Sequence, residues 1–171
     1  MKTLESYIRE IPDFPKKGVR FKDITPLLQD AFAFHQAVDA LVSLIQNEKI
    51  DCIVCIEARG FVFGGALADR LGVGVIPVRK KGKLPYRSRA ISYALEYGQA
   101  SLEIHEDAVK AGQRVLILDD LLATGGTAKA AAELVESFGA TVVGFLFLIE
   151  LGFLKGKERL KEYPVSSLIR Y

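Results

Sequence analysis

The feature that most constrains this chain is a short apolar run that leads into a glycine turn. Val115–Leu118 are followed by Asp119 and Asp120, and Thr124-Gly-Gly-Thr127 leads into an alanine-rich segment that reaches about residue 137. A short apolar run is typical of a buried strand in a parallel sheet, and the alanine-rich segment favours a helix. The pattern predicts a strand that ends on two carboxylates, then a turn and a helix.

Similar units alternate along the rest of the chain. We expect further helices over residues 3–10, 30–46, 61–70 and 155–162. We expect further strands over 52–57, 74–78 and 142–149 and a last short strand at the end of the chain. Residues 12–28 are expected to be irregular with one short strand, residues 80–92 to form a long loop, and residues 92–103 to form a hairpin. This alternation indicates an α/β fold with a mostly parallel central sheet flanked by helices, in which ligands bind beyond the carboxyl ends of the strands.

Composition narrows the class of protein. The 171 residues fit one domain, and half of them are apolar, which is enough for a full core. The net charge of +2 gives no reason to expect binding to nucleic acid or to a membrane. The N-terminus lacks the apolar stretch of a secretory signal, and no apolar run approaches the roughly 20 residues of a spanning helix. We therefore expect a cytoplasmic protein.

Cys52 and Cys55 form a C-x-x-C pattern inside a predicted strand. Side chains alternate along a strand, so residues three apart face opposite sides of the sheet. The two thiols cannot share a zinc ion, and no further Cys pair completes four ligands. We interpret them as buried structural thiols.

The turn at residues 123–127 has the properties of a phosphate site. The turn and the first helical turn offer unpaired backbone N–H groups, and the helix dipole adds positive potential. Gly125 and Gly126 allow close approach of an oxyanion, while Thr124 and Thr127 add hydroxyl donors. A Walker A loop needs Gly-Lys-Ser/Thr and a dinucleotide site needs Gly-x-Gly-x-x-Gly, and neither pattern fits here.

Asp119 and Asp120 would repel a bare phosphate. They make sense if the ligand also carries hydroxyls or a divalent cation, as a ribose phosphate does. The alternative is a surface acidic pair before an ordinary strand-to-helix turn.

The segment from Asp119 to Thr127 resembles the phosphoribosyl pyrophosphate signature of the type I phosphoribosyltransferases. Three more segments resemble the adenine-specific members of that family. They are the amino-terminal segment 14–28, the pyrophosphate loop 57–61, and the catalytic loop formed by 79–85 with 92–98. The resemblance runs in order from about Phe14 to Tyr171.

The resemblance implies a single domain over 1–171, with residues 1–30 as a base-binding hood and 79–98 as a mobile catalytic loop. It implies purine salvage: Mg²⁺-dependent transfer of the phosphoribosyl group from phosphoribosyl pyrophosphate to adenine, giving AMP and diphosphate. It also implies a homodimer. In this family the peptide before the arginine at position 59 is often cis, which for Ala58–Arg59 would be strained.

The resemblance also assigns residues. Glu96 would manage the proton at the purine N7, and Arg59 would act on the pyrophosphate; Glu96 could instead simply pair with a loop cation. The expected contacts are Ala123, Thr124, Gly125, Gly126 and Thr127 for the 5′-phosphate, Asp119 and Asp120 for the ribose, Arg59, Arg79, Lys80, Lys83 and Tyr97 for the pyrophosphate, and Val19, Arg20, Phe21 and Leu151 for adenine. Magnesium would be held through substrate and water near Asp119 and Asp120, with no direct protein ligand. Phe21 and Leu151 could equally be core residues.

Two other classes remain open. A transferase for a 6-oxopurine or for xanthine would share the phosphate loop but needs a different base-reading segment. A regulator that senses phosphoribosyl pyrophosphate could also keep the loop, but it would normally carry a DNA-binding module, and too few residues precede Phe14 to form one.

Overall fold

The computed structural model describes residues 2–94 and 99–171, and a seven-stranded sheet forms its centre. The strand order is β5-β6-β4-β3-β7-β8-β9. The strands span Cys52–Ile56 (β3), Gly74–Lys80 (β4), Ser88–Ala94 (β5), Gln99–His105 (β6), Arg114–Leu122 (β7), Thr141–Glu150 (β8) and Val165–Arg170 (β9). All neighbours from β4 to β9 pair in parallel, whereas β6 pairs antiparallel with both β4 and β5. The mostly parallel α/β sheet expected from the sequence is confirmed.

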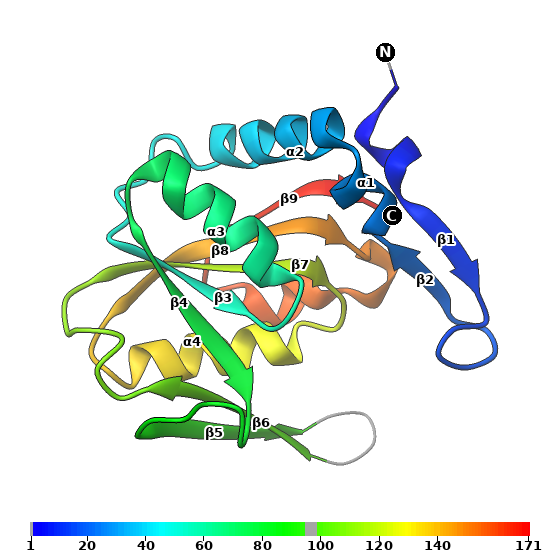
Figure 1. Cartoon of the computed structure of the whole chain (residues 1–171). Coiled ribbons are helices and arrows are strands. Elements are labelled where there is room, and N and C mark those ends of the chain that lie inside the picture. The colour runs from blue at the N-terminus through cyan, green and yellow to red at the C-terminus, as the bar shows by residue number, and fades with distance from the viewer. Residues whose placement is uncertain (1, 95–98) are drawn as a thin grey trace.

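Helices cover both faces of this sheet (Figure 1). Helices α2 (Ala31–Ser43) and α3 (Gly60–Leu71) pack on one face, and α4 (Gly126–Glu136) packs on the other. Strand β3 supplies both cores, because Ile53 and Cys55 join the α2–α3 side while Cys52 joins the α4 side. The two thiols therefore face opposite ways, as predicted, and burial raises the pKa of Cys55 to about 12.

The N-terminal segment forms a small unit beside the sheet. A short 3₁₀ helix, η1 (Leu4–Tyr7), precedes β1 (Arg9–Pro12), which pairs antiparallel with β2 (Arg20–Asp23) before α1 (Thr25–Gln29). The short helix predicted over 3–10 is confirmed only over Leu4–Tyr7, as a 3₁₀ turn, because Arg9 and Glu10 pair with β2 instead. The short strand expected within 12–28 is β2, and Pro26 lies in the first turn of α1, where a missing N–H costs nothing.

Two further sequence predictions are corrected. The loop predicted over 80–92 is much shorter, since β4 continues to Lys80 and β5 begins at Ser88. Strand β5 lies at the edge of the sheet and pairs only with β6. An edge strand needs no continuous apolar run, so its first residues gave no strand signal in the sequence. The charged helix predicted over 155–162 consists of the 3₁₀ turn η3 (Gly156–Leu160), which follows a second short turn, η2 (Gly152–Leu154).

Helix boundaries follow local chemistry. The Ala33 N–H donates to Asp30 Oδ1 at 2.9 Å, so Asp30 caps α2 as expected. Gly72 ends α3 with a φ of 67°, a left-handed conformation that glycine adopts without strain. Within residues 2–94 and 99–171, no helix is both long enough and apolar enough to cross a membrane.

Candidate active site

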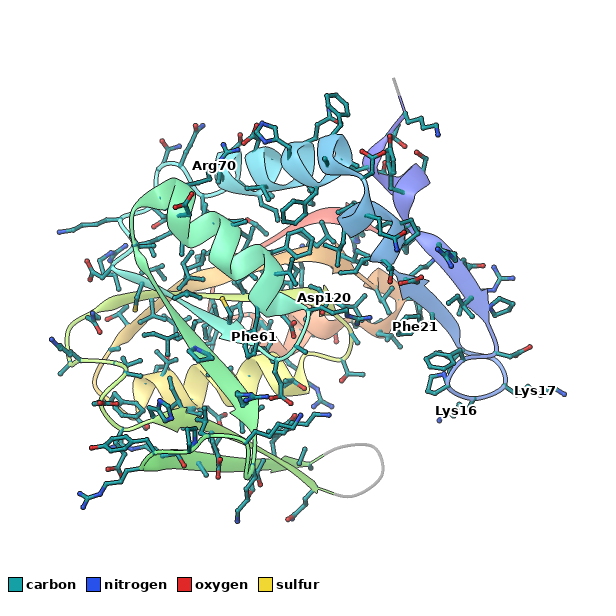
Figure 2. All side chains as sticks on the ribbon, viewed as in Figure 1. Lys16, Lys17, Phe21, Phe61, Arg70 and Asp120 are labelled. Atoms are coloured by element: carbon teal, nitrogen blue, oxygen red, sulfur yellow. The ribbon has the colours of Figure 1, made fainter. Side chains whose placement is uncertain are left out.

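Two neighbouring strands bring opposite charges together at the carboxyl edge of the sheet. β3 and β7 pair in parallel up to Cys55 and Leu118, so the residues that follow meet at one edge. Arg59, which directly precedes α3, places its Nε 2.7 Å from Asp120 Oδ2. Figure 2 shows Asp120 near the N-terminal end of α3, on the side of the molecule that carries Phe21. The strand is predicted to end on the two carboxylates, but its ladder with β8 continues past them to Leu122.

Asp120 is buried, Asp119 is half-buried, and the two are electrostatically strained. Burial raises the pKa of Asp119 well above its ordinary value, and the neighbouring Asp120 charge adds to the rise. Burial also raises the pKa of Asp120, while the Arg59 guanidinium opposes that rise. The Asp120 N–H donates to Asp119 Oδ1 at 2.8 Å. Within the described residues the buried Asp120 Oδ2 has an ion-pair contact but no aligned hydrogen-bond donor, so it can still accept from a ligand.

Gly60 lets α3 begin directly against Asp119. A Cβ at this position would lie 3.0 Å from Asp119 Oδ1 and 3.2 Å from Asp119 Cα. Any side chain would push the helix and the carboxylate apart, so glycine sets the spacing between Arg59 and the acidic pair.

The predicted phosphate turn surrounds a small cavity. Gly125 adopts a φ of 81° immediately before α4, and the backbone of residues 123–127 wraps the N-terminus of that helix. The cavity has a volume of about 90 Å³ and is lined by Asp119, Leu121, Leu122, Ala123, Thr124, Gly125, Gly126, Thr127, Ala128 and Phe147. The structure thus brings together all five residues expected to hold a phosphate.

A glycine that sequence reasoning missed supports this turn from behind. A Cβ on Gly156 would lie 2.3 Å from the Ala123 carbonyl oxygen, and one on Gly125 would lie 2.5 Å from the Gly156 carbonyl oxygen. The two backbones therefore touch, and only glycines fit there. A lone glycine in a charged segment gives no sequence signal of such a contact.

The segment that carries Gly156 is anchored by a buried carboxylate at the end of β8. Glu150 has a side chain only 4% exposed, and its Oε2 accepts from Lys157 Nζ at 2.8 Å and from Ser167 Oγ at 3.0 Å. Arg170 Nε lies 3.6 Å from Oε1. Burial acts to raise the pKa of Glu150, but these partners outweigh it and hold the pKa below its ordinary value.

A larger cavity opens next to the first and shares Asp119, Leu121 and Thr127 with it. Its volume is about 330 Å³, and its lining is Ile56, Glu57, Ala58, Arg59, Lys80, Tyr93, Ala100, Leu102, Asp119, Asp120, Leu121 and Thr127. Of the cations predicted to bind pyrophosphate, Arg59 and Lys80 line this cavity. Tyr93, which the sequence did not single out, places its hydroxyl 3.1 Å from Thr127 Oγ1 and so ties β5 to the phosphate turn.

The other two predicted cations, Arg79 and Lys83, contact Glu57 instead. Arg79 Nε lies 2.9 Å from Glu57 Oε2, and Lys83 Nζ lies 2.7 Å from Glu57 Oε1. The Glu57 side chain is only 5% exposed. Sequence reasoning assigned this glutamate no role, although it directly follows a buried strand.

Two of the residues expected to bind the base lie near parts of the site already described. The Arg59 guanidinium lies 5.2 Å from the Phe21 ring centre, and Phe14 meets Phe21 edge-on at 5.2 Å. Leu151 donates its N–H to Leu122 O at 2.9 Å, beside the start of the phosphate turn.

Val19 and Arg20 engage other groups in this conformation. The Val19 N–H donates to Lys16 O, and its carbonyl accepts from the Phe14 N–H, both at 3.2 Å. Arg20 Nη1 lies 3.0 Å from Glu10 Oε1. Glu96 and Tyr97 fall outside the described residues. Among the described residues, the peptides Phe14–Pro15 and Glu57–Ala58 are cis. The second of these lies one residue before Ala58–Arg59, the peptide considered from the sequence.

Comparison with known proteins gives this arrangement a family context. A family model described as the phosphoribosyl transferase domain matches residues 28–169. A curated protein from Caldanaerobacter subterraneus subsp. tengcongensis, named adenine phosphoribosyltransferase, is 58% identical over 168 residues, which cover 98% of this chain and 97% of that protein.

Solved structures agree with the sequence matches. The crystal structure of adenine phosphoribosyltransferase from Thermoanaerobacter pseudethanolicus has a TM-score of 0.96 at 57% identity, covering 99% of this chain and 100% of that one. The enzyme of that name from Saccharomyces cerevisiae, complexed with adenine and an iminoaltritol bisphosphate, has a TM-score of 0.91 at 43% identity and 96% coverage of both chains.

We predict that Gly156→Ala destabilises the chain by about 1–3 kcal/mol, the usual cost of an overpacked site, because the added methyl would clash with the Ala123 carbonyl. Urea unfolding measures this loss. Gly65→Ala is the matched control, since a Cβ there meets nothing within 4 Å and α3 gains helix propensity. Equal stability of the Gly156→Ala variant and the wild type would contradict the contact.

A second prediction concerns pH. The lowered pKa of Glu150 means that its contribution to stability is complete above its ordinary value of 4.5 and is lost as pH falls through the lower folded value. The difference in unfolding free energy between wild type and Glu150→Gln, about 1.5–3 kcal/mol at neutral pH for bonds to a charged group, therefore shrinks below that point. Glu158→Gln, at a side chain 72% exposed, is the control and shows no such trend. A pH-independent difference for Glu150→Gln would refute the assignment.

Proposed function

The chain belongs to the phosphoribosyltransferase family, and on that premise we propose that it transfers the phosphoribosyl group from phosphoribosyl pyrophosphate to adenine. The products are AMP and diphosphate, which makes this a purine-salvage reaction. The observation that carries the proposal is a pair of adjoining cavities. A phosphate-sized cavity at the α4 N-terminus shares Asp119, Leu121 and Thr127 with a larger one lined by Arg59 and Lys80.

The order of chemical groups along these cavities matches the order along the substrate. The 5′-phosphate would bind residues 123–127, where backbone N–H groups and the α4 dipole favour an anion. The ribose hydroxyls would donate to Asp119 and Asp120. The buried Oδ2 of Asp120 lacks an aligned donor within the described residues, so it has room for such a bond. The diphosphate would then lie in the larger cavity against Arg59 and Lys80.

This placement explains how the chain's own residues promote transfer. Positive charge develops at the ribose C1′ as the bond to diphosphate breaks, and the nearby aspartates stabilise it. Arg59 and Lys80 stabilise the negative charge that builds on the leaving diphosphate. Exclusion of water from C1′ favours attack by the purine over hydrolysis.

Magnesium is a cofactor that the donor set fits. Within residues 2–94 and 99–171, no group of three or more His, Cys, Asp or Glu side chains is arranged to hold a metal ion. Mg²⁺ typically uses one or two carboxylates together with substrate oxygens and water, so Asp119 and Asp120 could hold it only jointly with the substrate. When bound there, the ion would neutralise charge on the diphosphate oxygens.

The base would lie between Phe21 and Leu151. Phe21 presents a ring beside Arg59, and Leu151 lies beside the phosphate turn, so a flat heterocycle between them would face C1′. Val19 and Arg20 would read the amino edge through backbone groups, which requires the Phe14–Val19 turn to open. Residues 1–30 would act as the hood and 79–98 as the catalytic loop of one domain.

We further propose a cytoplasmic homodimer. The exposed apolar side chains of Val62 on α3 and Val75 on β4, at 44% and 46% exposure, are available for burial between two copies. Light scattering of the full chain measures this directly. The reduced, buried thiols of Cys52 and Cys55 suit a reducing compartment.

We predict that the pure chain, given Mg²⁺, phosphoribosyl pyrophosphate and one purine at a time, forms nucleotide from adenine only. Chromatography of the products measures this. Added EDTA abolishes product formation, and excess Mg²⁺ restores it. Nucleotide from hypoxanthine, guanine or xanthine instead would keep the transferase but overturn the assignment of the base site. Absence of any nucleotide alongside tight substrate binding would favour the regulator.

We also predict that Glu96→Gln lowers kcat by about 10²–10⁴-fold, as expected when a general acid–base group is removed. Binding of AMP, measured by calorimetry, changes far less, because the amide is nearly isosteric. Glu106→Gln, at an exposed acid on the turn after β6, is the control. Equal losses in turnover and AMP binding would show that Glu96 does not manage a proton.

A further inference from the structure

Glu57 stands out as a buried acid beside a cavity proposed to bind an anion. It lines the larger cavity together with Arg59 and Lys80, and its side chain is only 5% exposed. A bare carboxylate there would repel diphosphate and would be costly to bury. Its charge must therefore be satisfied by its own partners.

Both carboxylate oxygens have such partners. Oε2 accepts from Arg79 Nε at 2.9 Å, and Oε1 accepts from Lys83 Nζ at 2.7 Å. Arg79 Nη1 also donates to the Lys83 carbonyl at 3.1 Å, so the three residues close a ring of contacts. Burial acts to raise the pKa of Glu57, but the bonds from Lys83 and Arg79 outweigh it and hold the pKa below its ordinary value.

These contacts fix the turn that follows β4. A second buried acid, Glu103 on β6, accepts from the Gly82 N–H at 3.0 Å, and the Lys81 N–H donates to Ser101 O at 3.1 Å. The turn is thus held through its side chains by Glu57 and through its backbone by β6. Lys80 lies between the two attachments, and it lines the cavity.

Arg79 and Lys83 differ from Lys80 in their partners, and Arg79 also faces the other side of the strand. Neighbouring residues on a strand point to opposite sides, so Arg79 and Lys80 cannot both face the same ligand while β4 stays regular. Arg79 and Lys83 together neutralise Glu57, whereas Lys80 has no partner among the described residues. Of the cations at residues 79–83, Lys80 is the one that lines the cavity.

We infer that Glu57 is a positioning residue: it clamps Arg79 and Lys83 so that Lys80 is presented to the diphosphate of phosphoribosyl pyrophosphate. This inference rests on the proposed function and deepens it. Glu57 touches no reacting atom in this account and acts through the two cations. Its removal would leave Arg79 and Lys83 unneutralised and mobile next to Arg59.

The first test is the kinetics of Glu57→Gln. The expected result is a rise of about tenfold in the KM for phosphoribosyl pyrophosphate, as for a lost buried charge partner, with the KM for adenine within twofold of wild type. Glu57→Asp keeps the charge and recovers most of the loss. Glu162→Gln, which breaks the exposed pair with Lys129, is the matched control and leaves both constants unchanged. Thermal unfolding of each variant identifies any that fail to fold.

A double-mutant cycle separates positioning from other effects. If Glu57 acts through its two partners, adding Glu57→Gln to an Arg79→Met/Lys83→Met variant changes the KM for phosphoribosyl pyrophosphate by less than about twofold. An additive loss would overturn the inference. So would a KM in Glu57→Gln that is unchanged or lower than in wild type, or equal losses for both substrates.

A binding measurement keeps the inference distinct from the proposed function. Calorimetry with inorganic diphosphate and Mg²⁺ is expected to show about tenfold weaker binding to Glu57→Gln than to wild type, and it needs no turnover. If wild type forms no AMP but the affinities differ in this way, the proposed function fails and the clamp stands. If wild type forms AMP and the affinities are equal, the clamp fails alone. Absence of diphosphate binding to wild type overturns the clamp.

Discussion

The site depends on keeping two adjacent carboxylates, one buried and one half-buried, near the end of a parallel strand. Neither aspartate would be stable there without compensation, because burial and mutual repulsion both raise their pKa values. Arg59 supplies the nearest positive charge at 2.7 Å, and Gly60 allows α3 to start close enough to deliver it. The same arginine contacts the Phe21 ring, so one side chain links the N-terminal segment to the centre of the sheet. A ligand that offers hydroxyls and a cation relieves the remaining strain, which is how an unfavourable cluster becomes a binding site.

Buried acids at this edge are each satisfied by cations. Glu57 pairs with Arg79 and Lys83, Glu150 pairs with Lys157 and Arg170, and Asp120 pairs with Arg59. Each acid lies at or near the carboxyl end of a strand of the parallel sheet, and its partners come from neighbouring strands, turns and the start of α3. The strands therefore fix the acids, and the acids hold the segments that pack beside them. Lys80 and Arg59 are the cations that line the larger cavity, so its positive charge comes from two fixed positions rather than from a diffuse basic patch.

Local patterns predicted much of this arrangement. The run before Asp119, the glycine–threonine turn and the alanine-rich helix each carry their structure in a few neighbouring residues, and the phosphate cavity is formed by the residues predicted to form it. What the sequence could not show arises from contacts between distant segments. The backbone contact between Gly156 and the phosphate turn, and the pairing of Arg79 with Glu57, join residues more than 20 positions apart. The sequence predicts a loop for the first half of β5, because an edge strand needs no continuous apolar run, although it does predict the hairpin that β5 forms with β6. The helix predicted over residues 3–10 is shorter than expected because pairing with β2 overrides a weak local preference at Arg9 and Glu10.

The most direct test of the account is a crystal structure of this chain with AMP bound. The account predicts the 5′-phosphate on the backbone of residues 123–127, the ribose hydroxyls on Asp119 and Asp120, and the adenine ring between Phe21 and Leu151. A phosphate bound instead in the separate cavity of about 300 Å³ that Lys129, Glu133 and Arg159 help to line, with the two aspartates free of the ribose, would contradict it.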